Sequence, residues 1–227
     1  YIHKIRIRSL IDPAPSLCLG SYDSNPMEMA GAYSTFVNQG VRIDPIYVTR
    51  IEDKQGNILA TFTPKANDVI PERVAHTVIQ MMKFVITGGT GRRMSYYLNN
   101  VDNMDIAAKN GTTNKNVDAW FMCAVPNLVV GTWVGGEENS IRFVQGADGS
   151  RIALPITGLF LKKVYENGTL GVNREDKFKF TSAPYKFKCR MPNEDSTTTT
   201  REISEESLEN SDIIPDEFIN QEGDFFD

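Results

Sequence analysis

Three stretches of the chain repeat apolar residues at the spacing of an α-helix, over residues 26–38, 71–85 and 156–165. Ser24 or Asn25 could cap the first, Pro26 suits its first position, and Gly40 lies just past its end. The expected inner faces are Met27, Ala30, Tyr33, Ser34 and Val37 in the first helix, Val74, Val78, Met81, Met82 and Val85 in the second, and Ile156, Leu159, Phe160 and Val164 in the third.

Short apolar runs between these helices predict strands. Residues 46–51 and 58–62 flank a polar turn that contains Gly56, which is typical of a hairpin. Residues 106–111, 119–125 and 128–134 form three more runs, and Pro126-Asn127 joins the last two by a tight turn. Strands that meet through hairpins beside separate helices indicate an α+β fold, with an antiparallel sheet and packed helices.

Charge divides the chain into two parts. Residues 191–227 carry 12 Asp and Glu against the single Arg201, a net charge of −11, whereas the other 190 residues carry 23 Lys and Arg against 17 Asp and Glu, a net charge of +6. We therefore predict a folded portion over residues 1–183 and a disordered acidic tail over residues 184–227, because the tail cannot bury enough apolar surface. No basic cluster exceeds Arg92-Arg93, so nucleic-acid binding is not expected.

Several other classes of site are disfavoured. No stretch approaches the roughly 18 uninterrupted apolar residues of a membrane-spanning helix. The three cysteines lie far apart without a Cys-x-x-Cys pair, and His3 and His76 are isolated, so no metal site is expected. The glycine cluster over residues 87–91 follows a predicted helix rather than a strand, which disfavours a dinucleotide site. We expect no cofactor.

One cluster has chemical potential: Lys109-Asn110-Gly111-Thr112-Thr113, where a predicted strand ends. Lysine supplies a point charge with three donors, and glycine allows another backbone to approach closely. Backbone N–H groups along such a strand can polarise a carbonyl and stabilise its oxyanion. The cluster suits an anionic ligand with amide groups that adds as an extra strand. Taken alone, it also fits an ordinary turn at the end of a strand.

The residues around this cluster make it specific. It is followed by Asp118-Ala119-Trp120-Phe121, then Pro126, then a Gly-Thr-Trp-Val-Gly run over residues 131–135. This order closely resembles the third active-site motif of the bifunctional, class A penicillin-binding proteins: Lys-Thr-Gly-Thr-Thr, Asp-Ala-Trp-Phe, a turn, and a strand ending near Trp-Val-Gly. Residues 15–21, 26–30 and 33–40 look like the family's segment after its second motif, and residues 89–91, ahead of the lysine, fit the family in the same order. The resemblance covers roughly residues 1–170.

The resemblance implies the fold of the serine β-lactamases and penicillin-binding transpeptidases. It also implies peptidoglycan cross-linking, in which an active serine attacks the D-alanyl-D-alanine end of a stem peptide and β-lactams acylate that serine. Class A members also carry a glycosyltransferase domain and an amino-terminal membrane helix. By family, the protein lies on the extracytoplasmic face of the bacterial inner membrane, and the membrane is contacted only through that segment.

The family also implies roles for the cluster. Lys109 would hold the carboxylate and influence proton transfer, and it is the candidate catalytic residue. The N–H of Thr112 would form half of the oxyanion hole while its hydroxyl contacts the carboxylate, Gly111 would give clearance, and Thr113 would help to turn the chain. Asn110 departs from the family's threonine or serine. Its amide can still donate, but it is longer and differently aimed, so we predict weakened recognition of the carboxylate.

Two family motifs are missing: no lysine has a serine three positions before it, and no asparagine has a serine two positions before it. With Tyr1 in first place, the chain is expected to be a carboxy-terminal piece of the transpeptidase domain that is inactive alone, since it lacks a nucleophile. The alternative is a non-catalytic envelope module that binds peptides. A piece of a serine β-lactamase is disfavoured by the Asp-Ala-Trp-Phe segment. Trp120, Phe121 and Trp133 are expected in the core.

Overall fold

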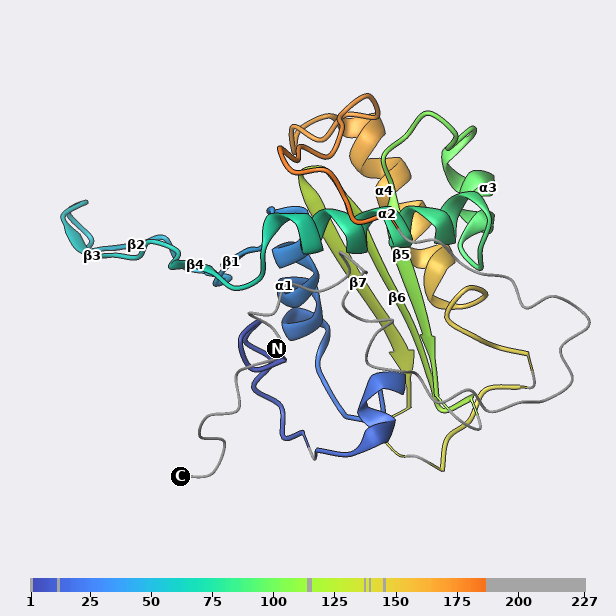
Figure 1. Cartoon of the computed structure of the whole chain (residues 1–227). Coiled ribbons are helices and arrows are strands. Elements are labelled where there is room, and N and C mark those ends of the chain that lie inside the picture. Colours follow the sequence, from blue (N-terminus) through green and yellow to red (C-terminus); the bar gives the residue numbers. More distant parts are fainter. Residues whose placement is uncertain are drawn as a thin grey trace, which may run out of the picture. The chain divides into compact units, whose positions relative to one another are not determined.

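The computed structural model describes residues 2–11, 13–113, 116–136, 138, 140–144 and 146–186. The chain divides into two units, Tyr1–Pro184 and Tyr185–Asp227, and the second lies almost entirely outside the described residues. The predicted disorder of the acidic tail therefore stays a prediction. Within the first unit, a three-stranded antiparallel sheet has the order β5-β6-β7, formed by Ala107–Thr112, Asp118–Val125 and Leu128–Gly135 (Figure 1).

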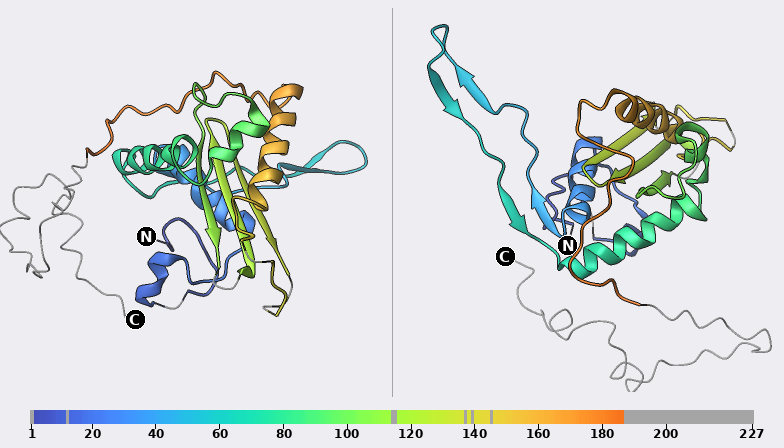
Figure 2. Two further views of the ribbon diagram at one scale, coloured as in Figure 1. Left: turned by 90° about the vertical axis from the view of Figure 1, so that its right-hand side faces the viewer. Right: turned by 90° about the horizontal axis from the view of Figure 1, so that it is seen from above.

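Helices cover both faces of this sheet (Figure 2). On one face lie α1 (Pro26–Val37) and α2 (Glu72–Thr87), whose Ile79 and Met82 pack with Ala107 and Ala124 of the sheet. On the other lie α4 (Ala153–Asn167), the short α3 (Ser95–Leu98) and the 3-10 turn η2 (Arg92–Met94). The predicted α+β fold with an antiparallel sheet is confirmed.

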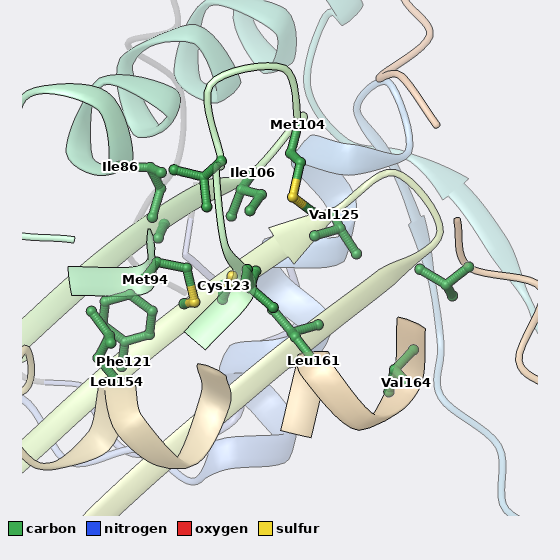
Figure 3. Close-up of a cluster of buried hydrophobic side chains, with 14 of the residues drawn as sticks. Ile86, Met94, Met104, Ile106, Phe121, Cys123, Val125, Leu154, Leu161 and Val164 are labelled. Carbon is green, nitrogen blue, oxygen red and sulfur yellow. The ribbon is translucent and has the colours of Figure 1, made fainter. Parts of the chain in front are cut away.

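The larger core lies between the sheet and α4 (Figure 3). Phe121 and Cys123 of β6 are fully buried there against Leu154 and Leu161 of α4 and Met94 of η2. Burial raises the pKa of the Cys123 thiol to about 12, so this cysteine packs as a small apolar residue.

The start of α1 is fixed by its cap. The side chain of Asn25 accepts a hydrogen bond from the Glu28 N–H at 2.9 Å, and Pro26 occupies the first turn. Past the helix end, Gly40 has φ 91°, and a Cβ there would lie 2.0 Å from the carbonyl oxygen of Ile70. Only glycine fits this position, which brings the end of α1 against the segment before α2.

Two small ladders complete the first unit. β1 (Val41–Ile43) pairs with β4 (Ala66–Asp68), and β2 (Arg50–Glu52) pairs with β3 (Ile58–Thr61), all antiparallel. The predicted hairpin turn is present, but its first strand is shorter than residues 46–51. The pairing of β1 with β4, and the 3-10 turn η1 (Pro15–Leu19), were not predicted.

The predicted inner face of the third helix is wrong in part. Val164 is buried, but Ile156, Leu159 and Phe160 are 51%, 53% and 43% exposed. The helix begins at Ala153 and instead buries Leu154, Thr157, Gly158 and Leu161 with Val164. A prediction from the periodicity of apolar residues alone misses this buried face, because two of its residues are Thr157 and Gly158.

The first two predicted helix faces are also imperfect. In α1, Tyr33 and Val37 pack against the core as expected, while Met27 is 47% exposed. In α2, Met82 is buried whereas Met81 is 63% exposed. Small residues account for the difference, since the fully packed positions of these helices include Ala32, Thr35 and Ala75.

Candidate substrate-binding strand

The predicted cluster lies on β5, which runs from the core to the surface. Ala107 and Ala108 at its start are completely buried, whereas Lys109 and Thr112 are exposed and Asn110 and Gly111 are half-buried. Thr113 follows directly and is exposed. Within the described residues β5 pairs only with β6, so it is an edge strand of this sheet.

One hydrogen bond decides which backbone groups of β5 face outward. The Thr113 N–H donates to the carbonyl oxygen of Asp118 at 3.4 Å, in line with a register that pairs Thr112 with Ala119. Along an antiparallel pair, every second residue directs its backbone N–H and C=O toward the partner strand. Because Thr113 does so, residues 109 and 111 also direct their backbone groups toward β6. The N–H and C=O groups of Asn110 and Thr112 therefore point to the outer edge.

Lys109 lies at this outer edge. Its ammonium Nζ donates to the backbone carbonyl oxygen of Asn110 at 2.8 Å, which is one of the outward-facing groups. No serine hydroxyl is hydrogen-bonded to Lys109 in the part of the chain that the structure describes. The positive charge and the open backbone groups thus share one surface.

The side chains of Asn110 and Thr112, which follow Lys109 on β5, each accept one hydrogen bond. Thr112 Oγ1 accepts from the Gly149 N–H at 3.3 Å, and no acceptor among the described residues takes its own hydroxyl hydrogen. Asn110 Oδ1 accepts from Thr90 Oγ1 at 2.7 Å, and within the described part of the chain the Asn110 Nδ2 hydrogens have no acceptor. With the Lys109 ammonium and the Thr112 N–H, these side chains offer hydrogen-bond donors, and the outward C=O of Thr112 adds one acceptor. Such a set suits a carboxylate.

Thr113 contacts the start of β6. Its Oγ1 accepts a hydrogen bond from the Asp118 N–H at 2.8 Å and so fixes the first residue of β6. Asp118 Oδ1 in turn accepts from Trp133 Nε1 of β7 at 2.8 Å. These contacts tie the three strands together at the end where the cluster lies.

The aromatic residues of the motif divide between core and surface. Phe121 is fully buried, as expected. The expectation was wrong for Trp133, which is 39% exposed because its indole N–H reaches the Asp118 carboxylate, and Trp120 is only half-buried.

Two contacts of the site were missed by sequence reasoning. Thr90 lies in the turn after α2, twenty positions before Asn110, and Gly149 lies in the loop before α4. A Cβ on Gly149 would lie 2.1 Å from the carbonyl oxygen of Trp120, so the loop touches the sheet backbone. No residue pattern in the sequence signals either contact.

A metal cluster and a membrane-spanning helix are not found in the described residues. No group of three or more His, Cys, Asp or Glu side chains could hold a metal ion there. None of the described helices is both long and apolar enough to cross a membrane. A cavity of about 520 Å³ lies between α1, β1 and the turn from β6 to β7, and none of the residues of the cluster lines it.

Comparison with known proteins gives the family. The family model described as the penicillin binding protein transpeptidase domain matches residues 16–135, which is more than half of the chain. The chain belongs to this family. Within the family it is part of the transpeptidase domain of class A penicillin-binding proteins.

Individual relatives cover this chain well but extend far beyond it. Penicillin-binding protein 1A of Aquifex aeolicus is 33% identical over 154 residues, 68% of this chain and 20% of the relative. The chain thus spans about a fifth of that relative's length. The crystal structure of penicillin-binding protein 1A from Haemophilus influenzae has a TM-score of 0.66 at 24% identity, over 73% of this chain and 30% of that one.

A second solved structure carries a ligand. The PonA1 protein of Mycobacterium tuberculosis, in complex with penicillin V, has a TM-score of 0.61 at 23% identity, over 78% of this chain and 50% of that one. At this identity the likeness establishes the fold.

Proposed function

We propose that this chain supplies the substrate-binding strand of a peptidoglycan D,D-transpeptidase, with Lys109, Asn110, Gly111, Thr112 and Thr113 forming one wall of its cleft. The observation that carries the proposal is the outer edge of β5, where the Lys109 ammonium lies on the same strand edge as the outward-facing N–H and C=O of Thr112. An extended peptide can add to such an edge through its backbone, and its terminal carboxylate then meets the donors.

Each residue has a distinct part in this proposal. The Lys109 ammonium attracts the carboxylate of D-alanyl-D-alanine. The Thr112 N–H, which faces outward, donates to the carbonyl oxygen that becomes negatively charged when the peptide is attacked. Gly111 allows the peptide backbone to approach without meeting a side chain. Thr113 orients the start of β6 through its hydrogen bond with Asp118.

The covalent step needs a serine from outside this chain. Its oxygen would bond to the carbonyl carbon of the penultimate D-alanine, the C–N bond would break, and the last D-alanine would leave with the serine proton on its amine. An amine of a neighbouring strand would then form the new amide and release the serine. β-Lactams would acylate the same serine. Since this chain has no Ser-x-x-Lys or Ser-x-Asn motif, we expect it to be inactive by itself.

This function places the site outside the cytoplasmic membrane, where peptidoglycan is cross-linked. A non-catalytic module that holds envelope peptides without turning them over is the second candidate. Asn110 in place of the family's hydroxyl residue and the absence of a Ser-x-x-Lys motif in this sequence motivate it. Both candidates predict that incubation with a fluorescent penicillin leaves no covalent label on this chain. A label that depends on a serine of this chain would contradict both.

The binding site itself is tested by titrating the chain with N-acetyl-D-alanyl-D-alanine and with the same dipeptide carrying a carboxamide terminus. We expect the acid to bind more tightly than the amide, and Lys109→Met to remove about tenfold of that preference, as for a charged hydrogen bond. Lys162→Met on α4 is the matched control, because Lys162 is a half-exposed surface lysine near Glu166. Equal binding of acid and amide by the unmodified chain would contradict the proposal.

A further inference from the structure

The turn that follows α2 reaches the candidate site through one side chain. Thr90 Oγ1 lies 2.7 Å from Asn110 Oδ1, and it belongs to the Gly89-Thr90-Gly91 sequence. Asn110 is the one position of the cluster where this chain departs from the family motif. The contact therefore involves the residue whose role the family pattern leaves open.

Close packing fixes the position of Thr90. A Cβ on Gly89 would lie 2.8 Å from Val85 Cα, and one on Gly91 would lie 3.1 Å from the carbonyl oxygen of Val85. The Gly91 N–H donates to that same oxygen at 2.8 Å. The turn is thus folded tightly against the last part of α2, and α2 is held to the sheet by Ile79, Met82 and Ile86.

The orientation of the Asn110 amide decides what it can bind. An amide presents an acceptor oxygen on one side and two N–H donors on the other. Lys109 does not compete for the amide oxygen, because successive side chains leave a strand on opposite faces and the Lys109 ammonium binds the backbone carbonyl of Asn110. In the described residues, the hydroxyl of Thr90 is the group that engages Oδ1.

We propose that Thr90 is a positioning residue, which holds the Asn110 oxygen away from the ligand and turns the two Nδ2 hydrogens toward its carboxylate. The ligand in this proposal rests on the proposed function. Without the Thr90 hydroxyl, the amide can rotate by half a turn and present its oxygen to the carboxylate, where two acceptors repel one another. Thr90 thereby adapts an asparagine to the place of a hydroxyl residue.

The first test needs no ligand. Side-chain couplings and NOEs of Asn110 in NMR spectra report its rotamer and which side of the amide faces Thr90. We expect a single orientation in the unmodified chain and in Thr90→Ser, which keeps the hydroxyl, and averaging over two orientations in Thr90→Val, which has the same shape without it. An unchanged Asn110 rotamer in Thr90→Val would overturn the proposal whether or not any peptide binds.

The second test measures the consequence for binding. We expect Thr90→Val to lower the preference for N-acetyl-D-alanyl-D-alanine over its carboxamide by about fivefold to tenfold, and Thr90→Ser to restore it. In an Asn110→Thr background, Thr90→Val should have no effect, since no amide remains to be oriented. A chain that fails to distinguish acid from amide contradicts the proposed function, whereas a chain that does so equally well with Val at position 90 contradicts only the role of Thr90.

Discussion

Gly149 touches the backbone of Trp120 so closely that a Cβ atom on the glycine would lie 2.1 Å from the Trp120 carbonyl oxygen and 2.8 Å from that of Gly111. These two strand residues are a register pair of β5 and β6. The loop before α4 therefore rests on the sheet at the cluster itself, and from there the Gly149 N–H reaches Thr112 Oγ1. The geometry of the site depends on a residue far from it in sequence.

Gly149→Ala should displace this loop. Overpacking of this kind costs about 1–3 kcal/mol of unfolding free energy, which urea denaturation measures. The N–H resonance of Thr112 should shift at the same time, because its side chain loses a partner. Gly171→Ala is the control: Gly171 has φ 63° but nothing near its Cβ position, so only backbone strain follows and β5 is unaffected. An unchanged Thr112 resonance in Gly149→Ala would contradict the contact.

Asn110→Thr should strengthen carboxylate binding. Threonine restores the short hydroxyl of the family motif, and one better-aimed hydrogen bond to a charged group corresponds to about a tenfold gain in affinity for N-acetyl-D-alanyl-D-alanine. Calorimetric titration measures it. Asn127→Thr, in the turn after β6 where the amide binds Asp176, serves as the control and should leave affinity unchanged. Equal affinities in all three chains would show that Asn110 does not weaken recognition.

Arg42 and Gly31 should be energetically coupled. The Arg42 side chain is 4% exposed, and its Nε and Nη1 atoms have no hydrogen-bond partner in the described part of the chain. Burial lowers the pKa of this guanidinium, although Asp44 at 3.8 Å partly offsets the effect. A Cβ on Gly31 would lie 2.2 Å from Arg42 Nη1, so the guanidinium fills the space beside the glycine.

In the chain that keeps Arg42, Gly31→Ala should therefore lower the free energy of unfolding by about 1–3 kcal/mol. In an Arg42→Ala background the same change should cost little, because the clash is gone. Urea denaturation of the four chains gives the coupling. Additive costs would contradict the packing of Arg42 against Gly31.

At low pH, the segment that contains Thr181 and Ser182 should detach from the start of α2. Glu72 accepts hydrogen bonds from the Thr181 N–H and Oγ1, each at 2.6 Å, and from Ser182 Oγ at 2.9 Å. The hydrogen bonds from Thr181 are the main reason why the pKa of Glu72 is lowered from 4.5 to about 2. Because the folded pKa is depressed, this stabilisation is fully present above pH 4.5 and is lost as the pH falls through about 2.

Amide exchange of Thr181 measured from pH 6 to pH 2 tests this linkage. We expect protection to fall over the acid end of that range, and Glu72→Gln to lack this pH dependence. Glu166→Gln, on the exposed surface of α4, is the control and should behave as the unmodified chain does. Protection that is independent of both pH and Glu72 would contradict the contact.

The sequence was a good guide to the sheet. Strands β5 to β7 were predicted within one or two residues, because long apolar runs and the Pro126-Asn127 turn leave little choice of register. It was a poorer guide to helix α4. The buried stripe there uses Gly158, where a Cβ would lie 2.7 Å from the Tyr97 ring, and Thr157, whose hydroxyl meets that of Thr132 at 2.7 Å. Such contacts depend on partners that are distant in sequence.

The same limit applies to the site. Lys109 to Thr113 could be singled out from residue types and from the family motif, since these residues are contiguous. Residues 89–91 fit the family pattern, but the contacts of Thr90 and Gly149 with the cluster could not be predicted, because only the folding of α2 and of the loop before α4 brings them to β5. The direction of the backbone groups of β5 also follows from a single hydrogen bond between Thr113 and Asp118, which no local pattern specifies.

The most direct measurement is a set of ¹H–¹⁵N NMR spectra of this chain with increasing N-acetyl-D-alanyl-D-alanine. If the outer edge of β5 receives the peptide, the amide resonances of Asn110 and Thr112 shift most, while those of Lys109 and Gly111, which are directed toward β6, shift little. The absence of any shift along β5, or larger shifts at Lys109 and Gly111 than at their neighbours, would contradict the assignment of this strand as the peptide-binding wall.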